Sequence, residues 1–174
     1  DQKSMNNEKV NVSTKKLYNE DLRPQFHFSP KENWTNDPNG MVYYKGTYHL
    51  FFQHNPVGIN WGNMTWGHSV SSDMVHWEEL EDAIVPDELG TIFSGTATVD
   101  WNNSAGFQVG DEKTIVASYT YCGSCEQFGD PGPDEPFTQA IAYSTDGGKT
   151  FTKYSGNPVL ENIAGGGDRD PKVF

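Results

Sequence analysis

Two aspartates of this chain lie beside a proline in short polar segments, and their type and surroundings favour sugar chemistry. Asp37 belongs to residues 34–40, which read WTNDPNG, and Asp170 belongs to residues 169–171, which read RDP. We expect both in tight turns. Carboxylates held on rigid turns suit glycosidic bond cleavage, because one must attack or stabilise a cationic sugar centre. A further carboxyl group should protonate the leaving oxygen, and residues 1–174 offer no convincing candidate for it.

The neighbours of the two aspartates support the same chemistry. Trp34 offers a flat apolar face on which the C–H surface of a sugar can stack. Arg169 can grip sugar hydroxyls and hold neighbouring carboxylates ionised. Each segment also has a simpler interpretation. Residues 34–40 fit an Asx/Pro/Gly turn that opens a hairpin, and Arg169 with Asp170 fits a surface ion pair.

Further polar and aromatic residues are candidates for the walls of a sugar pocket. Gln53 and Ser94 each donate and accept hydrogen bonds, which suits the recognition of hydroxyl groups. Phe93 precedes Ser94, and Trp61 belongs to residues 61–68, which read WGNMTWGH. For a single tryptophan, packing in the core is the alternative role. The five histidines show no metal-type spacing, and we expect no metal and no cofactor.

The elements that must hold these residues are short strands. Two β-rich runs flank Lys45 and Gly46, which predicts a hairpin. No window keeps a 3.6-residue apolar period, so we predict an all-β chain. The predicted strands cover residues 41–44, 47–53, 66–71, 91–99, 114–121, 139–144 and 151–154.

One turn is typical of β-propellers. Residues 144–151 read STDGGKTF and resemble the Asp-box, in which the aspartate stabilises a hairpin turn and the aromatic residue packs between blades. A looser copy, SSDMVHW, occupies residues 71–77. We interpret Asp73 and Asp146 as turn stabilisers rather than catalysts. The repeat predicts about two and a half blades, and because a propeller needs at least four, we expect a larger protein.

Composition restricts the possible partners and the compartment. A formal net charge of −12 argues against binding to nucleic acid or to an anionic membrane surface. No apolar run is long enough to span a membrane. Four Asn-x-Ser/Thr sequons, at Asn11, Asn33, Asn63 and Asn102, favour a secreted, periplasmic or cell-surface protein. The spacing of Cys122 and Cys125 leaves a disulfide, free thiols, a redox pair or half a zinc site open.

Taken together, these motifs resemble glycoside hydrolase family 32, which contains invertases, levanases and inulinases. The matching segments occur in the family's order: WTNDPNG (34–40), FFQHNP (51–56), WGN and WGH (61–63 and 66–68), FSG (93–95) and RDPKVF (169–174). The resemblance implies a five-bladed β-propeller, of which this chain covers roughly the first half. Residues 1–23 would then form a polar arm and residues 24–174 the partial catalytic domain, without the remaining blades and the C-terminal β-sandwich.

The resemblance also implies roles for particular residues. Asp37 matches the nucleophile of a retaining double displacement, and Asp170 matches the aspartate that stabilises the transition state. The substrates would be terminal β-D-fructofuranosyl groups of sucrose, levan or inulin. Positions that line the fructose pocket in the family are matched by Asn36, Gln53, Trp61, Phe93, Ser94 and Arg169.

The chain departs from the family pattern in three ways. Thr35 replaces the usual methionine, and Asp168 replaces the usual phenylalanine. The negative charge of Asp168 beside Asp170 should raise the pKa of one of these two carboxyl groups. The family's general acid is a glutamate in a Glu-Cys motif downstream of Arg-Asp-Pro. No such motif occurs before Phe174, so we expect these 174 residues alone to be nearly inactive.

Three other functions fit parts of the pattern. A fructosyltransferase would share the covalent intermediate and differ only in the acceptor that enters the pocket. A carbohydrate-binding propeller would keep the aromatic residues and tolerate loss of Asp37. A sialidase, which the Asp-box also fits, needs an arginine cluster, whereas this chain has only Arg23 and Arg169. The preferred fructan, exo or endo action and the oligomeric state are not fixed by the sequence.

Overall fold

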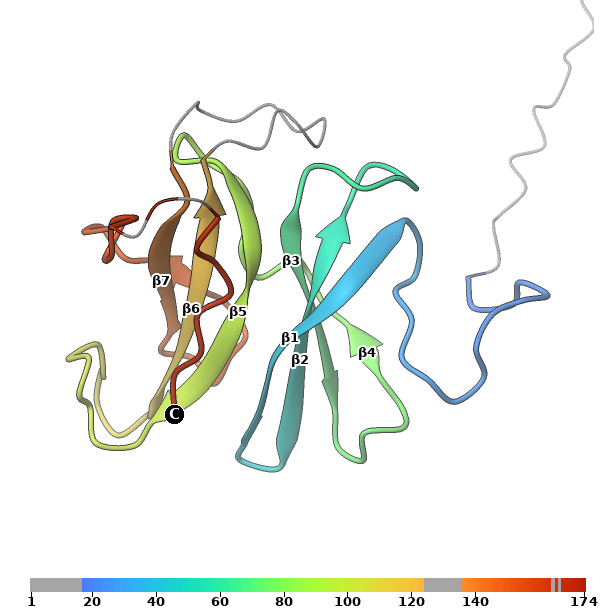
Figure 1. Cartoon of the computed structure of the whole chain (residues 1–174). Coiled ribbons are helices and arrows are strands. Elements are labelled where there is room, and N and C mark those ends of the chain that lie inside the picture. The colour runs from blue at the N-terminus through green and yellow to red at the C-terminus, as the bar shows by residue number, and fades with distance from the viewer. Residues whose placement is uncertain (1–16, 124–135, 164, 166) are drawn as a thin grey trace, which may run out of the picture.

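The computed structural model describes residues 17–123, 136–163, 165 and 167–174, and two four-stranded antiparallel sheets make up its regular structure (Figure 1). The first sheet contains β1 (Trp34–Tyr44), β2 (Thr47–Asn55), β3 (Thr65–Ser71) and β4 (Glu78–Glu79). The second contains β5 (Thr91–Asp100), β6 (Thr114–Cys122), β7 (Thr138–Ser144) and β8 (Thr152–Lys153). The described residues include no helix, so the all-β prediction is confirmed.

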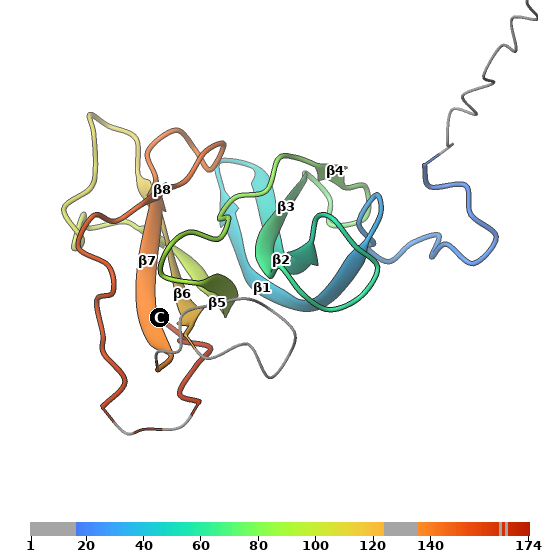
Figure 2. The ribbon, with the colours of Figure 1, turned by 90° about the horizontal axis from the view of Figure 1, so that it is seen from above.

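Each sheet is a meander in which consecutive strands pair, as in a propeller blade, and we name them blade 1 (β1–β4) and blade 2 (β5–β8). Seen from above, the two blades lie side by side (Figure 2). Their first strands come into close contact at Gly40, where an added Cβ would lie 2.2 Å from the backbone nitrogen of Ala97. The propeller prediction is therefore confirmed for the blades that this chain contains.

The core fills the space between the blades. Trp66 of β3 is fully buried, and its ring contacts Phe51 of β2 and Tyr119 of β6. The indole Nε1 donates a hydrogen bond of 2.9 Å to the carbonyl oxygen of Phe93 on β5. The side chain of Trp66 in blade 1 thus both packs against blade 2 and forms a hydrogen bond with its backbone.

The Asp-box interpretation is confirmed by the turn between β7 and β8. Asp146 accepts hydrogen bonds from the backbone N–H groups of Lys149 and Thr150, both at 3.0 Å, and from the hydroxyl of Ser144 at 2.7 Å. Phe151, which ends the motif, packs edge-on against Phe51 of blade 1, with ring centroids 5.3 Å apart. The aspartate stabilises the turn and the aromatic residue joins the blades.

The looser copy in blade 1 has the same construction. Asp73 accepts hydrogen bonds from the backbone N–H groups of Val75 and His76, both at 2.8 Å. Trp77 takes the place that Phe151 has in blade 2, and it packs against Phe28 in the segment before β1. The predicted repeat is therefore a repeat of blades.

Both predicted turns around the aspartates are wrong. Residues 34–40 begin β1 instead, and the pairing of β1 with β2 shifts register between Thr35 and Pro38 and again between Asn39 and Val42. Because β1 is an edge strand of its sheet, Pro38 is tolerated although it has no N–H to donate. Asp170 lies in an irregular segment and has a positive φ of 62°.

Part of the predicted polar arm is described, and it is held in place. Arg23 forms an ion pair with Glu20 at 2.7 Å and donates a hydrogen bond of 2.8 Å to the carbonyl oxygen of Lys31. Residues 1–16, which include the Asn11 sequon, lie outside the described residues, as does Cys125. Cys122 is disulfide-bonded. In the described part of the chain, no helix is long and apolar enough to cross a membrane.

Candidate active site

A pocket of about 170 Å³ opens where the two blades meet, and it collects most of the residues singled out in the sequence. They come from β1, β2, the β2–β3 connection, β5 and the C-terminal segment. Its lining consists of Asn36, Asp37, Gln53, Trp61, Met64, Phe93, Ser94, Arg169 and Asp170. Of the predicted site residues only Trp34 is missing. The pocket is smaller than the ~300–1,000 Å³ typical of drug-sized ligands, so its scale suits a single sugar ring.

Asp37 is held by a residue of the neighbouring blade. It lies on β1 within the first register shift, between Thr35 and Pro38, and the hydroxyl of Ser94 on β5 donates a hydrogen bond of 2.8 Å to its Oδ2. The pairing of β5 with β6 also shifts register, between Phe93 and Gly95, and this displaces Ser94 from the regular pairing. Such bulges redirect side chains beside active sites. The contact leaves the other carboxylate oxygen of Asp37 without a bond from Ser94.

The two carboxylates interact electrostatically. Burial raises the pKa of Asp170, the nearby guanidinium of Arg169 opposes this rise, and the negative charge of Asp37 adds to it. The Arg169 Nε lies 3.7 Å from Asp170 Oδ2. Our expectation that Asp168 raises this pKa is wrong, because burial and Asp37 are its causes. A carboxyl group whose pKa is raised by burial and by a neighbouring carboxylate is a common feature of catalytic sites.

Gln53 brings an unused hydrogen-bond donor to the pocket. Its side chain is only 2% exposed, and its Nε2 has no hydrogen-bond partner among the described residues. A buried N–H group without a partner is costly, so such groups are normally satisfied by a ligand or by water. A hydroxyl group of a bound sugar is a suitable acceptor for it.

Aromatic and apolar residues form the remaining walls. Trp61 meets Phe93 edge-on with ring centroids 6.0 Å apart, and Phe137 supports Phe93 from behind at 5.5 Å. Met64 also lines the pocket, which the sequence did not indicate because a methionine in a short loop resembles any core residue. Trp34 lies outside the lining, and its Nε1 donates a 2.9 Å hydrogen bond to Asn36 Oδ1. It therefore orients a pocket residue instead of forming a wall.

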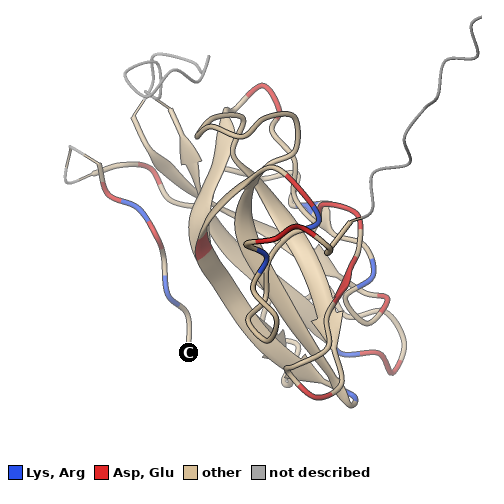
Figure 3. Cartoon of the chain, turned by 90° about the vertical axis from the view of Figure 1, so that its right-hand side faces the viewer, with Lys and Arg blue, Asp and Glu red and all other residues tan. Residues whose placement is uncertain are grey.

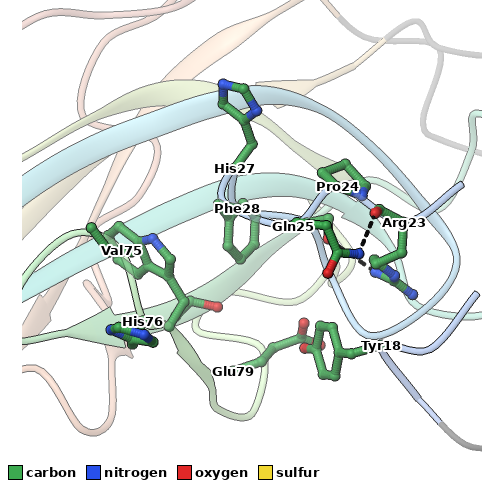
Figure 4. A pocket seen from close by; sticks show the side chains of 12 residues that line it. Tyr18, Arg23, Pro24, Gln25, His27, Phe28, Val75, His76 and Glu79 are labelled. Atoms are coloured by element: carbon green, nitrogen blue, oxygen red, sulfur yellow. Dashed lines mark hydrogen bonds between the residues drawn. The ribbon is translucent and has the colours of Figure 1, made fainter.

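A second pocket, of about 260 Å³, lies between the N-terminal segment and the turn at Asp73 (Figure 4). Trp77, Phe28 and Arg23 contribute to its lining. Glu79 is the only carboxylate there, and it already accepts a hydrogen bond of 2.7 Å from the backbone N–H of Lys31. Without a pair of carboxylates it does not have the chemistry of the first pocket.

Comparison with known proteins identifies the family. The family model described as "Glycosyl hydrolases family 32 N-terminal domain" matches residues 27–174. The chain belongs to glycosyl hydrolase family 32. The resemblance inferred from the motifs is thereby confirmed.

Individual members of family 32 are similar in sequence and structure. A levanase of Bacillus subtilis is 57% identical over 157 residues, which is 90% of this chain and 22% of the levanase. An invertase of Schizosaccharomyces pombe is 48% identical, covering 90% of this chain and 27% of that protein. The crystal structure of an exo-inulinase from Aspergillus awamori superposes with a TM-score of 0.76 at 43% identity, over 90% of this chain and 33% of that one. The chain thus spans about a fifth to a third of the length of these relatives.

Proposed function

We propose that the protein carrying this chain hydrolyses terminal β-D-fructofuranosyl residues of sucrose or of fructans such as levan and inulin, with Asp37 as nucleophile. The observation that carries this proposal is the single pocket in which Asp37 and Asp170 meet between polar and aromatic side chains. The similar proteins include a levanase, extracellular exo-inulinases and invertases, which supports the substrate class.

The reaction would be a double displacement that retains the anomeric configuration. Asp37 attacks the anomeric carbon of fructose and forms a covalent fructosyl-enzyme, while the bond to the leaving oxygen breaks. Asp170 and Arg169 hydrogen-bond the ring hydroxyls as positive charge develops, and Trp61 with Phe93 covers the apolar side of the ring. Water then attacks the anomeric carbon and gives its proton to the residue that protonated the leaving oxygen, which releases fructose and restores the Asp37 carboxylate.

The proton of the leaving group has to come from another residue. Among the described residues, the pocket lining contains no glutamate, and its only carboxylates are Asp37 and Asp170. We assign this role to a glutamate beyond Phe174, as the family pattern implies. General acid–base assistance is worth about 10²–10⁴ in rate, so residues 1–174 without that glutamate should turn over substrate slowly at best.

The same comparisons support a location outside the cytoplasm. Several of the similar proteins are described as extracellular exo-inulinases. We propose a secreted, periplasmic or cell-surface protein. Fractionation of the native cells followed by detection of the protein in the medium or envelope would test this.

The decisive experiment measures release of fructose from sucrose, inulin and levan by the full-length protein and by its Asp37→Ala variant. Loss of the nucleophile should lower kcat by about 10⁴-fold or more. A slow fructoside substrate should leave one fructosyl unit on the peptide that contains Asp37, seen by mass spectrometry. A sugar-binding propeller would bind sucrose equally well with and without Asp37 and release no fructose. A transferase would produce longer fructosides instead of free fructose.

A further inference from the structure

The segment that carries Arg169 and Asp170 is fastened to blade 2 by side chains of the sheet. Residues 167–174 are not assigned to a strand, so no ladder of backbone hydrogen bonds holds them. The Nε2 of Gln139 on β7 donates to the carbonyl oxygen of Asp168 at 2.9 Å. The backbone N–H of Asp170 donates to the hydroxyl oxygen of Thr120 on β6 at 3.0 Å. These two contacts lie on either side of Arg169.

The two contacts belong to one continuous network. The hydroxyl of Thr120 donates a short hydrogen bond, 2.6 Å, to Oε1 of Gln139. Because a hydroxyl has one hydrogen, this leaves a lone pair of Thr120 for the N–H of Asp170. Both ends of the Gln139 amide are used, which fixes its orientation. The chain of bonds therefore runs from Asp170 through Thr120 and Gln139 to Asp168.

Asp170 needs such a network because its backbone is strained. Its φ of 62° lies in the left-handed region, which is unfavourable for residues other than glycine. Strain of this kind costs about 1–3 kcal/mol and persists only where the surroundings impose it. The group that Thr120 holds is the N–H of the strained residue itself. Loss of that bond would let the backbone relax and move the Asp170 carboxylate away from Asp37.

The pair of Thr120 and Gln139 has an equivalent pair in blade 1. Thr120 and Gln139 are directly opposite each other on β6 and β7. The pair with the same position in blade 1 is Gln53 and Trp66, opposite each other on β2 and β3. In blade 1 this position supplies a pocket donor and a buried indole. In blade 2 it supplies the hydrogen bonds that hold the segment with Asp170.

We propose that Thr120 and Gln139 are positioning residues that hold Asp170, and Arg169 with it, in the orientation needed for fructosyl transfer to Asp37. Neither residue lines the pocket, so they act through the segment that they hold. The inference rests on the proposed function for its effect on turnover. Its structural part, the restraint on Asp170, stands independently of the substrate.

A matched control lies on the same strand. Thr114 of β6 is fully buried like Thr120, but its hydroxyl oxygen has no hydrogen-bond partner among the described residues. Replacement of either threonine by valine removes a buried hydroxyl and keeps the shape of the side chain. Any difference between Thr120→Val and Thr114→Val therefore reports the network and not burial in β6.

The test compares variants of the full-length protein with sucrose as substrate. Thr120→Val should lower kcat/KM by about 10- to 100-fold, mainly through kcat, since a displacement of about 1 Å at a reacting group has effects of this size. Thr120→Ser, which keeps the hydroxyl, should stay within about threefold of the parent. Thr114→Val should be unchanged. If Thr120→Val does not fold, Gln139→Leu replaces it in the test. Gln139 is half-buried, and this variant removes its hydrogen bonds to Thr120 and to Asp168.

Amide hydrogen exchange at Asp170 separates this proposal from the proposed function. Exchange should be faster in Thr120→Val than in the parent and in Thr114→Val, because the Asp170 N–H loses its acceptor. If the parent releases no fructose but exchange responds in this way, the proposed function fails and the restraint on Asp170 stands. The proposal is overturned if exchange at Asp170 is unchanged in Thr120→Val, or if Thr120→Ser loses as much activity as Thr120→Val.

Discussion

The clearest energetic prediction concerns Trp66, which connects the two blades. Replacement by phenylalanine removes the 2.9 Å hydrogen bond to the Phe93 carbonyl, and an orphaned buried acceptor costs about 1–3 kcal/mol. It also removes part of a fully buried ring, on the order of 50 Å² or about 1 kcal/mol. Trp66→Phe should therefore lower the free energy of unfolding by about 2–4 kcal/mol.

Urea unfolding followed by circular dichroism measures this loss, with Trp101→Phe as the control. Trp101 is 61% exposed, so its replacement should change the free energy of unfolding by less than about 0.5 kcal/mol. Because Phe93 lines the pocket, Trp66→Phe should also raise KM for sucrose. A stability within 0.5 kcal/mol of the parent would refute the role of Trp66 as the connection between blades.

Three further predictions concern charge and backbone. Asp37→Asn should lower the pKa of Asp170, because it removes the negative charge that adds to the effect of burial; titration of the Asp170 carboxyl by NMR would show no shift if the two groups were independent. Burial and a neighbouring histidine lower the pKa of His68 to about 3, whereas in the unfolded chain it is about 6.5. Stability should therefore decline as pH falls from about 6.5 toward 3, and His68→Leu should make this decline shallower in pH-dependent unfolding. Gly148→Ala should lower Tm more than Gly147→Ala. Both glycines have positive φ, but of the two only Gly148 would place the new Cβ 2.5 Å from a buried histidine ring. Equal Tm values for the two variants would contradict this.

Much of the fold was predictable because the strands are separated by strong turn signals. The Lys45–Gly46 hairpin and the Asp-box at Asp146 are local patterns, and each fixes the strands on both sides of it. Residues 34–40 were predicted as a turn because Asn, Asp, Pro and Gly favour turns wherever they cluster. In the structure their strand is imposed from outside, by pairing with β2 and by close contact with β5.

Most of the pocket residues were also predictable, since their motifs are specific and occur in the family's order. Met64, which lines the pocket, and Trp34, which was predicted to line it and does not, show which placements the sequence could not predict. Whether an apolar side chain lines a pocket, packs in the core or supports a neighbour depends on how the strands and their connections pack together. Thr120 and Gln139 are far from Asp170 in sequence. The pairing of β6 with β7 brings them together beside the segment that carries Asp170.

The charge distribution shows a similar dependence on tertiary structure. The C-terminal segment carries alternating acidic and basic residues beside the sheet (Figure 3). In the sequence, Asp168 and Asp170 flank Arg169 symmetrically and are equivalent candidates. The structure separates them, because Asp168 is held by its backbone carbonyl whereas the carboxylate of Asp170 lines the pocket. The tertiary structure, and not the order of the charges, thus distinguishes the two aspartates.

The same reasoning makes Gly40 the residue that sets the distance between the two blades. An alanine Cβ there would lie 2.2 Å from the backbone nitrogen of Ala97, so β1 and β5 would have to separate. The hydrogen bond from Ser94 to Asp37 spans this gap and would lengthen with it. Gly40→Ala should therefore cost about 1–3 kcal/mol through overpacking and also lower kcat/KM for sucrose. Gly46→Ala is the control, because its φ of +84° is equally unsuited to alanine but no atom lies within 4 Å. If Gly46→Ala lowered kcat/KM as much as Gly40→Ala, backbone strain in the β1–β2 hairpin and not the spacing of the blades would govern the site.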